Sequence, residues 1–278
     1  MVETIETTGF ATQLLDSKEG DEVVVLLHGG GPGANAATNW QAFIPGLADR
    51  YRVLAPDIYG FGNTEHPEQP PASMTGWMRA RVNQIIALLD RLGVEQAHLV
   101  GNSAGGALSM WIASTAPERV TDLVLMGSAG GQMAAPTPEV IRMASFYKDP
   151  SRAGIEQLTR WFVYDEATLE GSIAQIVEDR YLEVSRPDVR RSFLSMYSTP
   201  TSPMEMAVPP SALRRIQQRV LLVHGREDRF VTADSSVYLN QNLPNSQLHV
   251  FDKCGHWVQI ERREAMTFLV RSFLAGEL

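Results

Sequence analysis

A glycine-rich segment around Ser103 has the residue types of a nucleophilic site. The sequence GNSAG, from Gly101 to Gly105, matches Gly-x-Ser-x-Gly and directly follows the apolar run from Ala97 to Val100. Between a strand and a helix, this pattern places its serine on a sharp, strained turn, where the flanking glycines let neighbouring backbone approach closely. The pattern also occurs in ordinary glycine-rich helix entries, so Ser103 is a candidate nucleophile that needs supporting groups.

A base and a carboxylate that could activate this serine follow later in the chain. Serine at its ordinary pKa is a poor nucleophile, so it needs a base, and the base needs an orienting carboxylate. His256 lies in KCGHW after the last predicted strand, and Asp228 lies in HGREDRF after the preceding one. The order Ser, Asp, His is that of α/β-hydrolases. The alternatives are a turn histidine, a helix-capping aspartate, or Glu227 as the carboxylate.

Backbone N–H groups that could hold an oxyanion come from two places. One is Ala104, directly after the serine, and the other is the glycine-rich stretch HGGGPG, in which we choose Gly30. A single donor of this kind contributes roughly 3 to 4 kcal/mol to catalysis. Such a stretch could also cradle a phosphate, but neither Gly-x-Gly-x-x-Gly nor Gly-Lys-Ser/Thr is present. The sequence therefore predicts no cofactor.

The elements around these groups alternate short β-branched runs with amphipathic segments, which is typical of an α/β fold. We predict strands over 22–28, 51–56, 97–100, 120–126, 220–223 and 248–251. We predict helices over 40–50, 77–92, 104–115 and 265–274. Because the strands show no apolar–polar alternation, they should be buried on both faces of a mostly parallel sheet. Each predicted site residue then follows a strand at the same sheet edge.

The alternation stops between Gly130 and about Pro210, where strand signals are absent and several prolines occur. Helical pieces are predicted at 155–162 and 173–191 within this stretch. We therefore predict a core formed by residues 1–130 and 210–278, interrupted by a helical cap insertion over 131–209. Ligands of open α/β sheets bind at the carboxyl edge of the strands, so the cap should cover that edge.

Composition excludes several classes of protein. The chain has 278 residues, of which 44% are hydrophobic and 20% charged, and its net charge of −8 disfavours a nucleic-acid partner. No signal peptide or membrane-spanning run is predicted, and the single cysteine, Cys254, favours a cytoplasmic protein with a buried, inert thiol. No metal-ligand spacing occurs. We expect His28 and His224 to support loops, and Arg79 and Arg81 to lie on solvated faces.

Four motifs together resemble those of the meta-cleavage product hydrolases, bacterial carbon–carbon bond hydrolases of aromatic-ring and steroid-ring degradation. The motifs are HGGGPGA with a downstream Asn39-Trp40 pair, GNSAGG around Ser103, GREDRFV around Asp228, and CGHW around His256. The second is common to many hydrolases, whereas the first and last are more specific. The resemblance covers the whole chain and implies an α/β-hydrolase fold.

The resemblance implies an activity and roles for named residues. Water would cleave the C5–C6 bond of a 2-hydroxy-6-oxohexa-2,4-dienoate, giving 2-hydroxypenta-2,4-dienoate and a carboxylic acid. Ser103 would attack the C6 carbonyl with His256 as base and Asp228 as its orienter. The dienol would first tautomerise, so that carbon leaves as a stabilised dienolate and no cofactor is needed. The implied substrate-binding residues are Gly31, Asn39, Asn102, Arg180 and Trp257. A homo-oligomer is also implied.

Simpler interpretations exist for three of these residues: Arg180 as an exposed helix residue, Asn39 as a helix cap and Trp257 as core. The segment from Tyr164 to Arg180 is also a few residues longer than in several relatives, so the sequence leaves open whether Arg180 reaches a carboxylate.

Two alternative functions use the same triad. One is an ester, thioester or lactone hydrolase, and the other is a ligand receptor on a hydrolase scaffold. The sequence also leaves open the group carried by C6 of a dienoate. Candidates to line that side of a pocket are Trp161, Phe162, Met196 and Met204.

Overall fold

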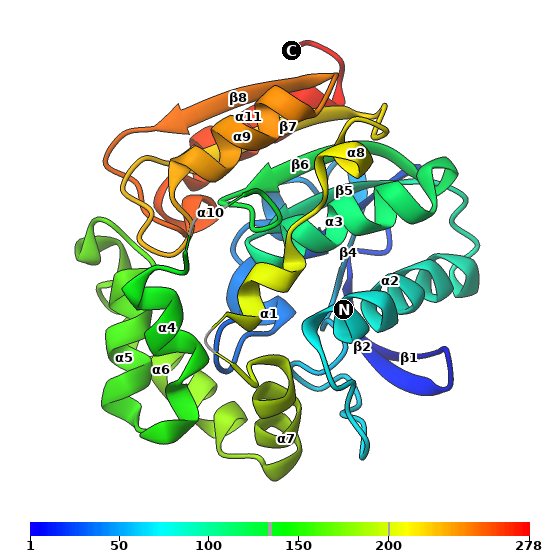
Figure 1. The fold of residues 1–278 in the computed structure, drawn as a ribbon. Coiled ribbons are helices and arrows are strands. Elements are labelled where there is room, and N and C mark those ends of the chain that lie inside the picture. Colours follow the sequence, from blue (N-terminus) through cyan, green and yellow to red (C-terminus); the bar gives the residue numbers. More distant parts are fainter. Residues whose placement is uncertain (133–134, 200) are drawn as a thin grey trace.

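The structure, a computed structural model, describes residues 1–132, 135–199 and 201–278. These residues form one eight-stranded sheet in the order β1-β2-β4-β3-β5-β6-β7-β8 (Figure 1). The strands are β1 (Val2–Thr7), β2 (Phe10–Asp16), β3 (Glu22–Leu27), β4 (Tyr51–Pro56), β5 (Ala97–Asn102), β6 (Val120–Met126), β7 (Arg219–Gly225) and β8 (Ser246–Phe251). Neighbours from β4 through β8 in this order are parallel. The predicted α/β class with a mostly parallel sheet is confirmed.

Strands β1 and β2 form an antiparallel hairpin that the sequence analysis missed. Their turn residues Thr8 and Gly9 both have positive φ, at 44° and 85°, as a two-residue hairpin with the twist of a sheet requires. In β1, half-buried side chains alternate with exposed ones, so it lacks the continuous apolar run of the central strands. The sequence signal for this hairpin is a short alternation of apolar and polar residues around a glycine turn.

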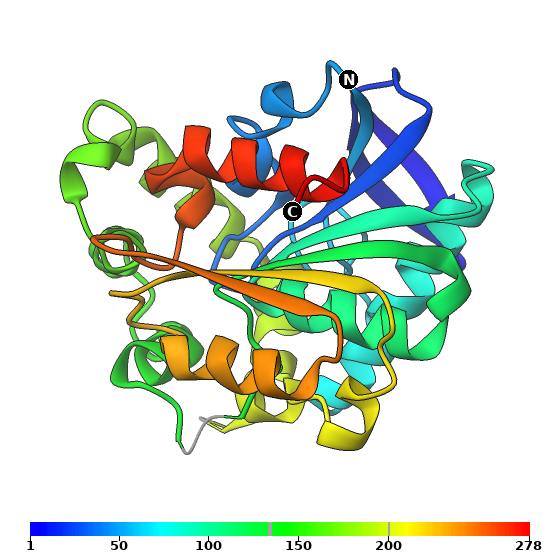
Figure 2. The same cartoon turned by 90° about the horizontal axis from the view of Figure 1, so that it is seen from above.

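Helices cover both faces of the sheet, and each face has its own apolar cluster. Figure 2 shows α11 over one face and α9 over the other. Trp40 and Phe273 belong to the cluster on the α11 side, whereas Trp77 and Leu108 belong to the cluster on the other side. The helices that accompany the sheet are α1 (Ala36–Trp40), α2 (Met74–Arg91), α3 (Ala104–Thr115), α8 (Pro210–Leu213), α9 (Ala233–Asn242), α10 (Val258–Glu261) and α11 (Arg263–Leu274).

The described residues between β6 and β7 are mainly helical and lie at one end of the molecule (Figure 1). We call this helical part the inserted segment. Its elements are α4 (Pro138–Ala144), α5 (Arg152–Trp161), α6 (Ile173–Val184), α7 (Pro187–Met196) and the 3-10 helix η5 (Ser202–Met206). The boundaries of 131 and 209 for a cap stay a prediction. Within the described ranges, no helix has the length and apolarity needed to cross a membrane.

Two predicted helices were wrong in extent. The helix expected over 40–50 is replaced by α1, which ends at Trp40, and by a 3-10 turn over Ile44–Gly46. Asn35 caps α1 by accepting from the Thr38 amide at 2.8 Å, and Pro45 and Gly46 interrupt regular helix further on. The piece expected over 173–191 is two helices, because Pro187 begins a new helix instead of continuing the first.

Candidate active site

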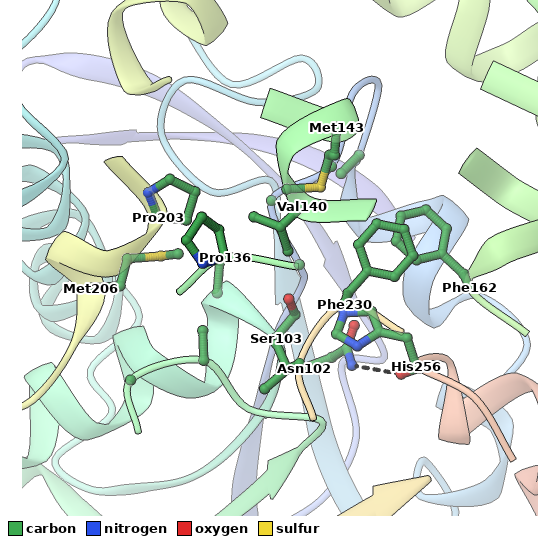
Figure 3. Close-up of a pocket in the computed structure, with 18 of the residues that line it drawn as sticks. Asn102, Ser103, Pro136, Val140, Met143, Phe162, Pro203, Met206, Phe230 and His256 are labelled. Atoms are coloured by element: carbon green, nitrogen blue, oxygen red, sulfur yellow. Dashed lines mark hydrogen bonds between the residues drawn. The ribbon is translucent and has the colours of Figure 1, made fainter. Parts of the chain in front are cut away.

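A cavity lies where the strand-end loops meet the helical segment (Figure 3). All ten site residues predicted from the sequence lie in or beside it. Nine of them line its wall: Gly30, Gly31, Asn39, Asn102, Ser103, Ala104, Arg180, His256 and Trp257. The tenth, Asp228, lies behind His256. The fold thus brings together residues at or after the ends of four strands, β3, β5, β7 and β8, with Arg180 from the inserted helix α6.

Ser103 lies on the strained turn that the sequence predicts. Its φ of 57° and ψ of −120° are unusual for a residue with a side chain. A β-carbon at Gly105 would lie 2.0 Å from the Leu27 carbonyl oxygen, and one at Gly101 would lie 2.4 Å from the Gly105 oxygen. Both positions therefore need glycine. The close approach holds the turn between β5 and α3 and directs the Ser103 side chain into the cavity (Figure 3).

His256 is bonded to Asp228 and not to the neighbouring acid. Its Nδ1 lies 2.6 Å from Oδ2 of Asp228, and both side chains are buried. Glu227 instead accepts from the Cys254 amide at 3.0 Å and pairs with Arg226. With Nδ1 donating to the carboxylate, the Nε2 atom of His256 is free to accept a proton. This arrangement suits a base that takes the proton of a serine hydroxyl.

The Asp228 carboxylate is held by four donors. Oδ1 accepts from the amides of Phe230 and Val231 at 2.8 and 3.0 Å, and Oδ2 lies 3.4 Å from Nε2 of His224 as well as near His256. Burial alone would raise the pKa of Asp228, but the charge of His256 and the hydrogen bonds from both histidines hold it well below its usual range. Asp228 therefore stays a carboxylate.

His28 orients the peptide that carries the Gly30 N–H. Its Nε2 lies 2.9 Å from the Ile58 amide, which can only donate, so Nδ1 carries the hydrogen and donates to the Gly29 oxygen at 2.8 Å. The described residues contain no cis peptide bond, so the Gly30 N–H points away from that oxygen. The loop-supporting role expected for His28 thus has a specific geometry.

Ala104 and Gly30 lie side by side at the floor of the cavity. A β-carbon on Gly30 would lie 3.3 Å from that of Ala104, and Ala104 begins α3, where backbone N–H groups have no partner within the helix. From the inserted segment, the Tyr197 hydroxyl donates to the Gly30 oxygen at 2.7 Å. The shared oxyanion site of the Gly30 and Ala104 N–H groups stays a prediction.

Asn102 connects the serine turn to the histidine loop. Its Nδ2 donates to the His256 carbonyl at 3.4 Å, the dashed line of Figure 3, and to the Met126 carbonyl at 3.2 Å. Its Oδ1 is buried and has no partner among the described residues. A buried carbonyl oxygen beside the cavity can accept from a substrate hydroxyl.

Arg180 is not the exposed helix residue of the simpler interpretation. It is 2% exposed, its Nη1 donates to the Pro32 carbonyl at 3.1 Å, and its Nε has no partner among the described residues. The guanidinium lies over the rings of Phe162 and Trp257, at 5.5 and 5.1 Å from their centres. Burial lowers the pKa of Arg180 to about 10, so the side chain remains a cation at neutral pH. A buried cation of this kind attracts an anionic ligand.

Asn39 and Trp257 complete this side of the cavity. Asn39 is buried and donates from Nδ2 to the carbonyl of Asn35 at 2.9 Å, and Asn35, not Asn39, is the N-cap of α1. Trp257 stacks on Phe162 with ring centres 4.6 Å apart, and its backbone amide donates to the Phe162 carbonyl at 3.0 Å. Gly31 brings backbone close to the Arg180 guanidinium.

Three sequence-based interpretations of nearby residues were wrong, and one residue was missed. Arg81 is buried rather than solvated, with Nε donating to the Tyr59 carbonyl at 3.1 Å. Trp161 and Met196 do not line the cavity, although Phe162 and Met204 do. Tyr197 was not predicted, because nothing in the sequence indicates that the end of α7 reaches a loop 167 residues earlier.

Comparisons with known proteins agree with this geometry. Residues 24–267 match the model of the alpha/beta hydrolase family. The 2-hydroxy-6-oxo-2,4-heptadienoate hydrolase of Pseudomonas putida F1 is 38% identical over 97% of this chain and 94% of its own. The 2-hydroxy-6-oxononadienedioate/2-hydroxy-6-oxononatrienedioate hydrolase of Comamonas testosteroni is 35% identical over 97% and 93%.

A solved structure is also similar over its full length. It is the 2-hydroxy-6-oxo-6-phenylhexa-2,4-dienoate hydrolase of Rhodococcus sp. strain RHA1, with a TM-score of 0.91, 41% identity, and coverage of 99% of this chain and 100% of that one. Together, the matched residues, the identities and the fold show that this chain is a hydrolase of the alpha/beta hydrolase family and belongs, within it, to the meta-cleavage product hydrolases.

Proposed function

We propose that this enzyme hydrolyses the C5–C6 bond of a 2-hydroxy-6-oxohexa-2,4-dienoate, giving 2-hydroxypenta-2,4-dienoate and a carboxylic acid. The observation that carries the proposal is the buried Arg180 cation on the wall of the cavity that also holds Ser103 and His256. A neutral ester has no group for such a cation, whereas a dienoate has a carboxylate. The names of the relatives compared above support the same reaction.

The reaction proceeds in two stages. After the dienol tautomerises, Ser103 Oγ adds to the C6 carbonyl while His256 takes its proton, and the oxyanion is held by the N–H groups of Gly30 and Ala104. The tautomerisation has already moved the C2 hydroxyl proton to C5. When the C5–C6 bond breaks, its electron pair enters the dienolate, and the C2 oxygen takes the proton from His256, which gives 2-hydroxypenta-2,4-dienoate. Water, deprotonated by His256, hydrolyses the acyl-serine to the carboxylic acid. Asp228 stabilises the imidazolium in both stages.

The helical segment has a defined part in this proposal. Residues 131–209 act as a cap that supplies Arg180 to the substrate carboxylate and closes the cavity over Ser103. On the core side, Gly31, Asn39 and Asn102 contact the carboxylate and the C2 oxygen, and Trp257 lies against the diene. No step requires a metal or a cofactor.

The test is the replacement Arg180→Gln, assayed on a dienoate and on a neutral ester. We expect kcat/KM for the dienoate to fall by at least about 100-fold, because an anion loses its buried cation. Cleavage of the ester should change little. The matched control is Arg81→Gln, which removes a second buried arginine that does not line the cavity. That variant should not discriminate between the two substrates.

Other outcomes identify the alternative functions. Equal loss on dienoate and ester in Arg180→Gln would favour an ordinary ester or lactone hydrolase. The visible absorbance of the dienoate should disappear with wild-type enzyme and persist with Ser103→Ala. Persistence with the wild type would favour a receptor, and turnover by Ser103→Ala would remove Ser103 as the nucleophile.

A further inference from the structure

The two ends of the cavity differ in chemistry. One end, the arginine end, contains Arg180 beside Gly31: a β-carbon on Gly31 would lie 3.6 Å from Nη1 of Arg180, 3.3 Å from the Phe162 ring and 3.8 Å from the sulfur of Met143. The proposed function places the carboxylate of the dienoate at this end. The C6 carbonyl then lies at Ser103, and the group attached to C6 extends toward the opposite end.

The opposite end, the apolar end, has no charged side chain among its described residues. Figure 3 shows Met206, Pro203 and Pro136 together on the far side of Ser103 from Phe162 and His256. The buried or half-buried residues of the apolar end are Ala129, Pro136, Val140, Pro203, Met204 and Met206. The three residues outside the described ranges are Met133, Ala134 and Pro200, whose side chains carry no charge either.

Backbone contacts hold the apolar end in place from two sides. The Trp111 indole of α3 donates to the Met206 carbonyl at 3.3 Å, and the Val208 amide donates to the Gly130 carbonyl at 2.8 Å. The Ala129 amide donates to the Ser103 carbonyl at 3.0 Å, so this wall begins directly beside the nucleophile. A short group on C6 therefore meets apolar side chains at once.

Two other buried or half-buried arginines, Arg81 of α2 and Arg142 of α4, lie against residues outside the cavity. Arg81 donates to the Tyr59 carbonyl and its guanidinium lies over the rings of Phe61 and Trp77, at 5.0 and 5.3 Å from their centres. On α4, Nη2 of Arg142 lies 3.2 Å from the position of a β-carbon on Gly154, against α5. Neither lines the cavity.

We propose that the C6 substituent of the substrate is an uncharged alkyl or aryl group, and that the enzyme rejects dienoates that carry a second carboxylate on that side. This rests on the proposed function. A carboxylate placed at the apolar end would lose its hydration without gaining a cation or a side-chain donor from the six residues named above, which is costly. Family membership does not decide the matter, because relatives are named both for dienoates with one carboxylate and for a nonadienedioate, which has two.

The test compares dienoates that differ only at C6. The decisive pair carries 3-methylbutyl and 2-carboxyethyl groups, which have the same number and branching of heavy atoms and differ in charge. Phenyl and methyl dienoates complete the panel. We expect kcat/KM for the carboxyethyl substrate to be at least about 100-fold below that for the 3-methylbutyl substrate.

Each outcome has a separate meaning. Comparable turnover of the carboxyethyl and 3-methylbutyl substrates would overturn this inference and leave the proposed function intact. Failure to cleave any dienoate, together with ester hydrolysis, would overturn the proposed function and this inference with it. Discrimination against the carboxyethyl substrate alone supports both.

A variant can reverse the preference. Met206→Lys adds a cation to the apolar end, and we expect it to raise the ratio of carboxyethyl to 3-methylbutyl turnover by at least about tenfold. Thr201→Lys is the matched control, since it adds the same charge at an exposed position next to η5 and outside the cavity. An equal change in both variants would point to a general charge effect and count against the inference. The wild-type panel decides the question even if Met206→Lys does not fold.

Discussion

His256 and His224 both lie next to Oδ2 of Asp228. The two histidines carry their hydrogen on different ring nitrogens, and they differ in whether the second nitrogen has a partner. Nε2 of His224 lies 2.8 Å from the Val231 carbonyl, which only accepts, so this nitrogen carries the hydrogen. Its Nδ1 lies 2.6 Å from the Ser236 hydroxyl, so both ring nitrogens are engaged. Among the described residues, only the Nδ1 atom of His256 has such a partner. At the scale of single residues, the free Nε2 atom distinguishes the proposed base from the supporting histidine.

Replacing Asp228 by Asn should lower kcat by about 10⁴-fold. An amide cannot stabilise the imidazolium, and its NH₂ group favours the tautomer of His256 whose Nε2 already carries a hydrogen. The control is Glu227→Gln, which changes the neighbouring acid and should alter kcat less than about 3-fold, since Glu227 contacts Arg226 and the Cys254 amide instead of His256. Similar losses in the two variants would contradict the assignment. Both kcat values are measured with the same dienoate or ester.

His28 should make stability depend on pH. Burial lowers its pKa from 6.5 to about 3, so between these values the unfolded chain binds a proton that the folded chain does not. The free energy of unfolding should therefore fall as the pH drops through this window, by about 3 kcal/mol at pH 4 from this group. In His28→Gln this part of the fall should be absent, as measured by denaturant unfolding at pH 7, 5.5 and 4. His249→Gln, at an exposed position, should keep the wild-type slope.

At the scale of elements, one hydrogen bond joins the end of α7 to the loop after β3. Tyr197 is buried, and burial raises its pKa to about 12, so the hydroxyl keeps its hydrogen and donates to the Gly30 carbonyl. The inserted segment therefore contacts the loop that carries a proposed oxyanion donor. Its position and the geometry of that loop are coupled by this bond.

Tyr197→Phe tests the coupling. Loss of the hydroxyl leaves the buried Gly30 carbonyl without this donor, which should lower the free energy of unfolding by about 1 to 3 kcal/mol and lower kcat by roughly tenfold with little change in KM. Tyr147→Phe is the matched control, because its hydroxyl donates at 2.9 Å to the Val184 carbonyl inside the inserted segment. That variant should lose similar stability and keep its kcat. Unchanged kcat in both variants would show that Tyr197 has only a structural role.

Elements with continuous apolar runs or clear helical spacing were predictable, and the others were not. Strands β4 and β6 and helix α3 have the predicted bounds. The two strands are buried on both faces, so their apolar runs are continuous, and α3 begins directly after the glycine-rich turn at Ser103. The β1–β2 hairpin was missed and the helix over 40–50 was wrong, because exposed edge strands and short turns carry weak patterns. In these places tertiary packing decides the conformation.

At the scale of the whole molecule, the assembly of chains is an open prediction. The resemblance to the meta-cleavage product hydrolases implies a homo-oligomer. We expect light scattering on the eluting peak of a sizing column to give at least twice the mass of one chain at micromolar concentration. A mass equal to one chain, unchanged on concentration, would contradict this expectation.

The sequence by itself determined which groups are proposed to do the chemistry. Glycines at 101 and 105 mark a turn that only small residues permit, and the strand ends place Ser103, Asp228 and His256 at one sheet edge, since parallel strands share their carboxyl side. Only the tertiary structure decided which acid contacts His256. It also decided that Arg180 is buried without a carboxylate partner among the described residues, and that the Tyr197 hydroxyl reaches the Gly30 carbonyl. These contacts join segments far apart in the chain, and their distances depend on how the inserted helices pack, which no local pattern specifies.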